Sequence, residues 1–405
     1  MTVSATIQEY ERREIPLGSA AARELRRAAG GKLGVAPGSA EGHYEITATD
    51  HVGSFVTTEA TVLVRPKVPL HNVFTLLDAG LPADAWRSET FLYGADRDLL
   101  PAFAAVFARS VEGAISQGLL HAYREHQEDL ISLRGRMDLA RVVRRSGVAY
   151  PMPSRFDEFT VDIPENRILR AAVRRLRRIP GVPVPAAQAL ARVLARLEGV
   201  DDVHVEGGDV DRAVVYTRLN EHYRPALRLA DLVLGGASLL DRPGGLVADS
   251  FTLSMNHLFE RWTTHRFHRH LARPWRLRPQ ERWSLDRDRR VSMYPDLVFY
   301  EGDRPRYVAD VKYKLTATGL GRSDDYYQLL AYTAALGLEE GLLIYCQADG
   351  EAPPREIHVD SVGKRLLTYS LPLSGSTRDV ESAMTELVRF VEDRMRSRVS
   401  VGAVW

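Results

Sequence analysis

The segment from Met293 to Lys312 reads MYPDLVFYEGDRPRYVADVK and holds two apolar runs separated by a short polar stretch. That stretch, Glu301 to Pro305, is rich in turn-forming residues, so the pattern predicts two strands joined as a hairpin. Asp296 stands at the start of the first run, and Asp310 lies near the end of the second. An antiparallel pairing of the two strands would therefore place these carboxylates side by side.

Asp310 and Lys312 are two residues apart, so in an extended strand their side chains project from the same face. Two carboxylates and one lysine predict a divalent-metal site suited to cutting phosphodiesters. Mg²⁺ takes oxygen ligands, so Asp296 and Asp310 would bind it, with help from the Val311 carbonyl. The metal would polarise the phosphate and activate a water, while Lys312 orients that water or offsets transition-state charge. The alternative interpretation is a solvated Asp310–Lys312 pair on an edge strand.

Three further residues are candidates for the same site. Gln328 and Tyr332 are four apart on a predicted helix and share one face, where they could hydrogen-bond a phosphate or hold the lysine. A surface glutamine beside an amphipathic tyrosine is the alternative. Glu260, on the preceding predicted helix, could be a third acidic ligand, or it could pair with Arg261 or Arg266 on the helix surface.

Composition sets the broad class. The chain has 405 residues, 45% hydrophobic content and a net charge of +1, as expected for a soluble protein of two or three domains. It has no apolar run of about 18 residues and no secretory signal at its start, so we expect a cytoplasmic protein without a membrane span. The one cysteine, Cys346, is predicted to be a core residue and excludes a cysteine-ligated iron–sulfur cluster.

A basic tract precedes the candidate site. From Arg261 to Arg290 there are 10 arginines against Glu281, Asp286 and Asp288. Arginine binds phosphate oxygens through a bidentate fork, so the tract predicts a phosphate-contacting face, with solvated helix and strand ends as the alternative. The chain has no phosphate-binding Gly-x-x-x-x-Gly-Lys-Ser/Thr loop, so we do not expect it to be an NTPase itself.

The periodicity predicts a multidomain α+β protein. Residues 1–70 contain short alternating strands around one helix, and we assign them to a β-rich N-terminal domain. Residues 71–245 are mainly helical, with a long amphipathic stretch from Leu99 to His126. Residues 246–405 mix helices and strands, including a strand expected from Arg276 to Leu285. That order predicts an α/β domain with a central mixed sheet.

The candidate site residues resemble the motifs of the PD-(D/E)XK nucleases. The resemblance is carried by Pro295-Asp296, by Asp310-Val311-Lys312 and by Gln328 to Tyr332, which is similar to the Gln-x-x-x-Tyr helix of RecB-type members. Met255 to Glu260 resembles the first helix of that core. The resemblance implies a restriction-endonuclease-like domain at residues 246–405, using Mg²⁺ with Mn²⁺ as a substitute. It implies catalytic roles for Asp296, Asp310 and Lys312, and metal ligation by Asp296, Asp310, Val311 and Glu260.

Three other segments resemble the McrC family, the nuclease subunits of McrBC modification-dependent restriction systems. They are Ile7 to Glu11, Val64 to Val68 and Phe159 to Leu169. The resemblance implies cleavage of double-stranded DNA carrying a modified base such as 5-methylcytosine. It also implies a McrB-like AAA+ NTPase ring, using GTP or ATP, as the partner whose hydrolysis this chain stimulates. Residues 1–70 and 71–245 are expected to dock on that partner.

Two other functions remain open from the residues. One is a non-catalytic regulatory subunit of an AAA+ defence complex that docks on the ring and increases its turnover, but an intact Asp/Asp/Lys set argues against it. The other is a stand-alone RecB-like DNA nuclease that acts on DNA ends. The long segment before residue 246 and the lack of iron–sulfur cysteines argue against that second alternative.

Overall fold

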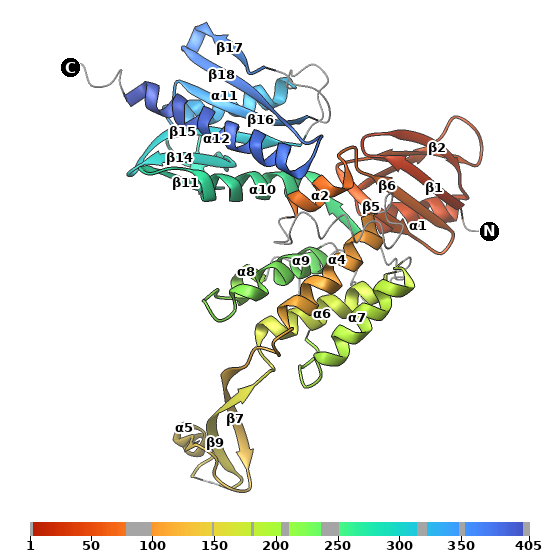
Figure 1. Ribbon diagram of the computed structural model, residues 1–405, viewed down its shortest axis with the longest axis vertical. Helices are drawn as coiled ribbons and strands as arrows, with labels where there is room; N and C mark the ends of the chain where they lie inside the picture. The colour runs from red at the N-terminus through yellow and green to blue at the C-terminus, as the bar shows by residue number, and fades with distance from the viewer. Residues whose placement is uncertain are drawn as a thin grey trace. The chain divides into compact units, whose positions relative to one another are not determined.

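The computed structural model describes residues 3–77, 99–147, 150–179, 182–203, 210–235, 251–313, 322–347 and 353–399. These residues form two compact units, coloured by position along the chain in Figure 1. The first unit combines the described residues up to 77 with those from 252 onward, and the second holds those from 99 to 251. No helix in the described ranges is long and apolar enough to cross a membrane.

The N-terminal part of the first unit is built from two small sheets. One has the strand order β1-β6-β5-β10, with β1 and β6 parallel, and the other has the order β2-β4-β3. Helix α1 packs its alanine- and leucine-rich face on β3 and β5. The elements are β1 (Val3–Gln8), β2 (Arg12–Pro16), α1 (Ser19–Ala29), β3 (Leu33–Pro37), β4 (His43–Ala48), β5 (His51–Val56), β6 (Ala60–Arg65), α2 (Leu70–Leu76) and β10 (Phe251–Ser254).

The C-terminal part of the first unit is a mixed sheet flanked by helices. Among the described residues its strand order is β11-β14-β15-β16-β18-β17. Strands β11, β14 and β15 are antiparallel neighbours, whereas β15, β16 and β18 run parallel. The strands are β11 (Trp275–Pro279), β14 (Leu297–Glu301), β15 (Arg304–Lys312), β16 (Glu340–Gln347), β17 (Arg355–Val359) and β18 (Lys364–Pro372). The predicted central mixed sheet and the β14–β15 hairpin are thus confirmed.

Helices cover both faces of this sheet (Figure 1). Helices α10 (Met255–His270) and α12 (Thr377–Val399) contact each other, and Phe267 of α10 packs on Phe299 of the sheet. Helix α11 (Ser323–Ala335) packs on the opposite face, where Leu329 joins Val298 in a buried cluster. Shorter elements complete this part: β12 (Trp283–Ser284), β13 (Ser292–Met293) and η2 (Asp360–Val362).

The second unit is a helical bundle. Its longer helices pack through alanine-, leucine- and valine-rich faces, as their amphipathic patterns require. The helices are α4 (Leu99–Ala114), α6 (Pro164–Arg178), α7 (Val184–Arg196), α8 (Val210–Ala213), η1 (Glu221–Tyr223) and α9 (Arg224–Gly235). These helices agree with the mainly helical character that the sequence predicts for this part of the chain.

A three-stranded antiparallel arm extends from these helices (Figure 1). It is made of β7 (Ala122–Leu130), β8 (Arg136–Met137), α5 (Leu139–Arg144) and β9 (Met152–Thr160). The prediction of one helix from Leu99 to His126 is wrong, because α4 ends at Ala114 and the chain continues into β7. Strand β7 pairs with β9 over its whole length, and such long-range pairing overrides local helical preference.

Candidate active site

The two predicted carboxylates meet at the end of the β14–β15 hairpin. Leu297 is paired with Ala309, so Asp296 and Asp310 occupy the next positions of the two strands. Both side chains are buried. The Val311 backbone N–H donates to Asp296 Oδ2 at 2.8 Å, which ties the two strands together beyond their last paired residues. The structure thus brings Asp296 and Asp310 together as the hairpin pattern predicts.

Asp310 and Lys312 form an ion pair in the sheet interior. Asp310 is 1% exposed, and the Lys312 ammonium nitrogen lies 2.6 Å from its Oδ2. Strand β15 lies between β14 and β16, so the alternative of a solvated pair on an edge strand is wrong. Burial and the neighbouring Asp296 carboxylate raise the pKa of Asp310, despite the opposing effect of Lys312. The second oxygen, Asp310 Oδ1, has no hydrogen-bond donor among the described residues.

This arrangement fits a hard divalent cation. A buried carboxylate oxygen without a partner is costly, and a cation ligated there would satisfy it. Mg²⁺ commonly uses one or two protein carboxylates and takes its other ligands from water and substrate. In the part of the chain that the structure describes, no group of three or more His, Cys, Asp or Glu side chains could hold a metal. The hairpin supplies two carboxylates at this position, those of Asp296 and Asp310.

Glu260 lies next to this pair, and its side chain is hydrogen-bonded to Gln280. Its Oε1 accepts a hydrogen bond from Gln280 Nε2 at 2.7 Å, and the same nitrogen lies 2.7 Å from Asp296 Oδ1. Burial and then the negative charge of Asp296 raise the pKa of Glu260. Arg266, which the sequence offered as an alternative partner, instead pairs with Glu381 at 2.6 Å.

Gln328 and Tyr332 interact on helix α11, as their spacing predicts. Gln328 Nε2 donates to the Tyr332 hydroxyl at 2.7 Å, and that hydroxyl donates to the Tyr294 carbonyl at 3.4 Å. Tyr332 is buried, and its pKa is raised by burial and by the charge of Asp310. The alternative of a purely surface pair is therefore wrong for Tyr332, whereas a phosphate contact stays a prediction.

Sequence reasoning missed Gln280. The expected strand from Arg276 to Leu285 is interrupted, because β11 ends at Pro279 and Gln280 adopts a left-handed backbone with φ of 50°. The signal that could have found this break is Pro279 itself, since proline inside a strand marks an edge or an end. The break turns the Gln280 side chain towards the two acidic residues.

Asp325 is a further buried carboxylate near the site, and the sequence did not single it out for this role. It accepts a hydrogen bond from the Tyr345 hydroxyl at 2.8 Å. Burial lowers the pKa of Lys312, but the carboxylates of Asp310, Asp296 and Asp325 outweigh that effect and raise it. Lys312 therefore keeps its proton at neutral pH.

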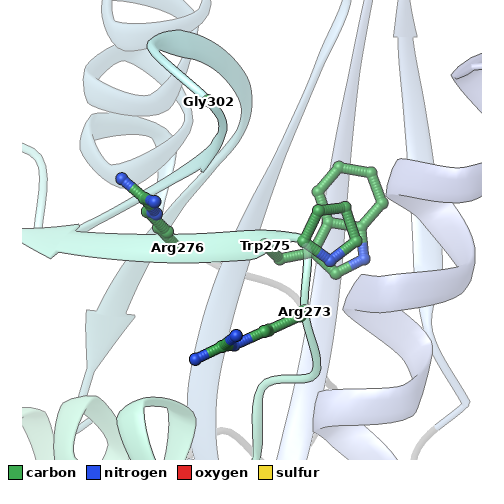
Figure 2. Close-up of a pocket in the computed structure, with 5 residues that line it drawn as sticks. Arg273, Trp275, Arg276 and Gly302 are labelled. Carbon is green, nitrogen blue, oxygen red and sulfur yellow. The ribbon is translucent and has the colours of Figure 1, made fainter.

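The basic tract is only partly neutralised. Arg266 and Arg278 are engaged with carboxylates. The arginines of the tract whose side chains make neither a hydrogen bond nor an ion pair within the described residues are Arg269, Arg273, Arg276, Arg287 and Arg289. Figure 2 shows Arg273 and Arg276 beside Trp275 at a cavity of about 590 Å³ near Gly302. This cavity lies at the start of β11, at the opposite end of the strand from Gln280.

Two of the family-like N-terminal segments meet at the strand that carries Lys312. The hydroxyl of Tyr313, the next residue, donates to Glu9 Oε1 at 2.9 Å, and the Lys67 backbone N–H donates to the same oxygen at 2.6 Å. The Tyr10 hydroxyl donates to the Tyr313 carbonyl at 3.1 Å. Glu9 is fully buried, and burial raises its pKa from 4.5 to about 7.

Glu9 is expected to make the stability of the chain decrease from acidic to neutral pH. An acid with a higher pKa in the folded state binds its proton more tightly when the chain is folded. The contribution of Glu9 to the free energy of unfolding is therefore complete below pH 4.5 and is lost as the pH rises through about 7. The difference is on the order of 3 kcal/mol. Urea unfolding across this range should show it, and Glu9→Gln should flatten the slope. An equal slope in the variant would contradict the assignment.

The fold defines this chain as a multidomain α/β protein, and comparison with known proteins identifies its family. A family model described as "McrBC 5-methylcytosine restriction system component" matches residues 46–346, which is more than half of the chain. The chain belongs to this family, which confirms the McrC resemblance. It is therefore a component of an McrBC-type restriction system. No curated protein matches the chain.

Two solved structures are similar to the chain. One is the refined half-complex from a tetradecameric assembly of Thermococcus gammatolerans McrB AAA+ hexamers with bound McrC. The similar chain has 20% identity and a TM-score of 0.57, and the match covers 95% of this chain and 100% of that one. The other is the cryo-EM structure of the Thermococcus gammatolerans McrBC complex, with 22% identity, a TM-score of 0.43 and coverage of 67% and 89%. The first likeness supports the overall fold.

Proposed function

We propose that this chain is the Mg²⁺-dependent endonuclease subunit of its restriction system and that residues 246–405 form a PD-(D/E)XK nuclease domain. Asp296 and Asp310 hold the Mg²⁺ ion, which Mn²⁺ can replace. The Val311 carbonyl oxygen is a further metal ligand. The observation that carries this proposal is the buried Asp310 Oδ1, which no donor in the described ranges satisfies. A cation at this oxygen would offset the cost of burying the carboxylate.

The residues around the carboxylates have separable tasks in this proposal. A bound divalent cation supplies Lewis acidity toward the scissile phosphate. Lys312, held at Asp310 and kept protonated by the surrounding carboxylates, orients the attacking water or offsets negative charge in the transition state. Gln328 and Tyr332 form a hydrogen-bonded pair on the same face of the sheet, where they contact a phosphate or position the lysine.

The proposed substrate is double-stranded DNA carrying a modified cytosine. The family description supports this substrate, since it names a 5-methylcytosine restriction system. The arginines without ion pairs in the described tract support contact with the phosphate backbone, because such contacts supply sequence-independent affinity for DNA. Arg273 and Arg276 at the cavity of Figure 2 are candidates for these contacts.

The proposed partner is a McrB-like AAA+ ring that hydrolyses GTP or ATP, and this chain stimulates that hydrolysis. The name of the similar assembly, McrB hexamers with bound McrC, supports this partner. The arm of the second unit supports a docking role, because it exposes Tyr123, Ile131, Val143 and Phe159, each at least 60% exposed. The rings of Tyr123 and Phe159 pack against each other, and exposed apolar groups in contact of this kind mark an interaction surface. We therefore assign ring engagement to the arm.

Plasmid cleavage tests this function directly. The purified chain is incubated with Mg²⁺, with and without the AAA+ partner and its nucleotide, on methylated and unmethylated plasmid. Cutting only with the partner, on methylated DNA, is the expected result. If no condition gives cutting while nucleotide turnover by the partner rises, the chain is a regulatory subunit. Cutting without the partner would instead indicate a stand-alone nuclease.

A further inference from the structure

Gln280 holds an unusual position at the edge of the candidate site. It follows the last residue of β11, and its backbone N–H donates to the Asp296 carbonyl at 3.2 Å. Its φ of 50° lies in the left-handed region, which carries a conformational cost for a residue with a side chain. Glycine would adopt this backbone without that cost. A glutamine in this conformation therefore points to a task for its side chain, which its contacts define.

The Gln280 amide is placed between two carboxylates. Its Nε2 lies 2.7 Å from Glu260 Oε1 and 2.7 Å from Asp296 Oδ1, so each amide hydrogen is used by one acid. Because both neighbours are carboxylates, the amide nitrogen and not its oxygen must face them. Gln280 thus occupies with a neutral donor the position where a cation would bridge Glu260 and Asp296.

The two sides of Asp296 therefore differ in their ability to bind a cation. Asp310 carries a buried oxygen without a donor, whereas Glu260 Oε1 is already satisfied. Glu260, Asp296 and Asp310 do not form a three-carboxylate group able to hold a metal in the described structure. A cation is consequently favoured on the Asp310 side of Asp296 and disfavoured on the Glu260 side.

We infer that Gln280 is a positioning residue that keeps Glu260 away from the metal, so that the site takes up one divalent cation rather than two. This inference rests on the proposed function, because it assumes that Asp296 and Asp310 bind a cation. The amide donor holds Glu260 beside Asp296 without a second metal, and it also keeps the Asp296 side chain in place. Cation number is thereby set by a side chain that ligates no metal.

Mn²⁺ binding to the full-length chain, followed by the electron paramagnetic resonance signal of free Mn²⁺, tests the inference without relying on cleavage. We expect the unmodified chain to bind about one equivalent. Gln280→Gly should bind about two, the second more weakly, because Glu260 becomes available as a carboxylate ligand. Glycine suits the left-handed backbone, so this variant keeps its fold. The double variant Gln280→Gly/Glu260→Gln should return to about one equivalent, and Gln117→Ala, at an exposed glutamine of the second unit, is the control.

Each other outcome is decisive. Two equivalents bound by the unmodified chain, or unchanged number and affinity in Gln280→Gly, would overturn the inference while leaving the nuclease proposal intact. A second equivalent that persists when Glu260 is also replaced would overturn the assigned role of Glu260. Absence of Mn²⁺ binding to the unmodified chain would overturn both the inference and the proposed function.

Discussion

Replacing Asp310 with asparagine is expected to abolish DNA cleavage, lowering its rate by at least about 10³-fold. The substitution removes a carboxylate ligand from the proposed cation, whose Lewis acidity contributes several kcal/mol to the stabilisation of the transition state. The asparagine amide has nearly the same shape as the carboxyl group it replaces. It also removes a buried charge, and the burial of that charge is what raises the pKa of Asp310. Plasmid cleavage in the presence of partner and nucleotide measures the effect.

The same variant should keep its fold and its effect on the partner. Its thermal unfolding and its stimulation of nucleotide hydrolysis should match those of the unmodified chain, because Asp310 lies in the first unit and the arm in the second. Asp324→Asn is the matched control, since Asp324 is an exposed acid on helix α11. Cleavage by a contaminant-free Asp310→Asn preparation would remove Asp310 from the catalytic assignment.

Removing the arm is expected to abolish stimulation of the partner's nucleotide hydrolysis. Ala122 and Thr160 are directly paired at the base of β7 and β9, so a short glycine linker can join the chain at this position. The deletion removes the exposed apolar residues of the arm and leaves the helices of the second unit intact. Nucleotide turnover by the partner, measured against chain concentration, reports the effect.

Point variants separate the arm surface from the arm fold. Tyr123→Ser with Phe159→Ser should reduce stimulation at least about tenfold, since aromatic residues commonly dominate binding energy at interfaces. Val184→Ser is the matched control, because Val184 is 69% exposed on helix α7 of the same unit. Mn²⁺ binding should be unchanged in every arm variant. Full stimulation by the arm deletion would show that the partner docks elsewhere.

The centre of the candidate site could be predicted from local sequence. Two apolar runs around a turn-rich stretch specify an antiparallel hairpin, and the hairpin geometry brings Asp296 to Asp310. Period-two alternation then places Lys312 beside Asp310, where the ion pair is found. The i, i+4 spacing likewise predicts the Gln328–Tyr332 hydrogen bond. Each of these contacts joins residues that are close in the sequence. The regular geometry of a hairpin, a strand or a helix is enough to place such residues side by side.

The same local reasoning failed where distant segments decide the structure. Gln280 reaches Glu260 and Asp296 because β11 ends at Pro279, six residues before the predicted end of the strand at Leu285. Strand β7 replaces the end of a predicted helix because β9, far along the chain, supplies its hydrogen-bonding partner. In both cases a tertiary contact outweighs a local preference of a few tenths of a kcal/mol per residue.

By itself, the sequence determined the hairpin, the helix that follows it and the residue types at the candidate metal site, because these depend on periodicity and turn chemistry. Only the tertiary structure decided that β15 is an interior strand, which buries Asp310 and leaves one of its oxygens without a donor in the described residues. Only the tertiary structure joined Glu9 to Tyr313, 304 residues apart. Burial and long-range hydrogen bonds arise from packing between segments, and no local pattern specifies which segments meet.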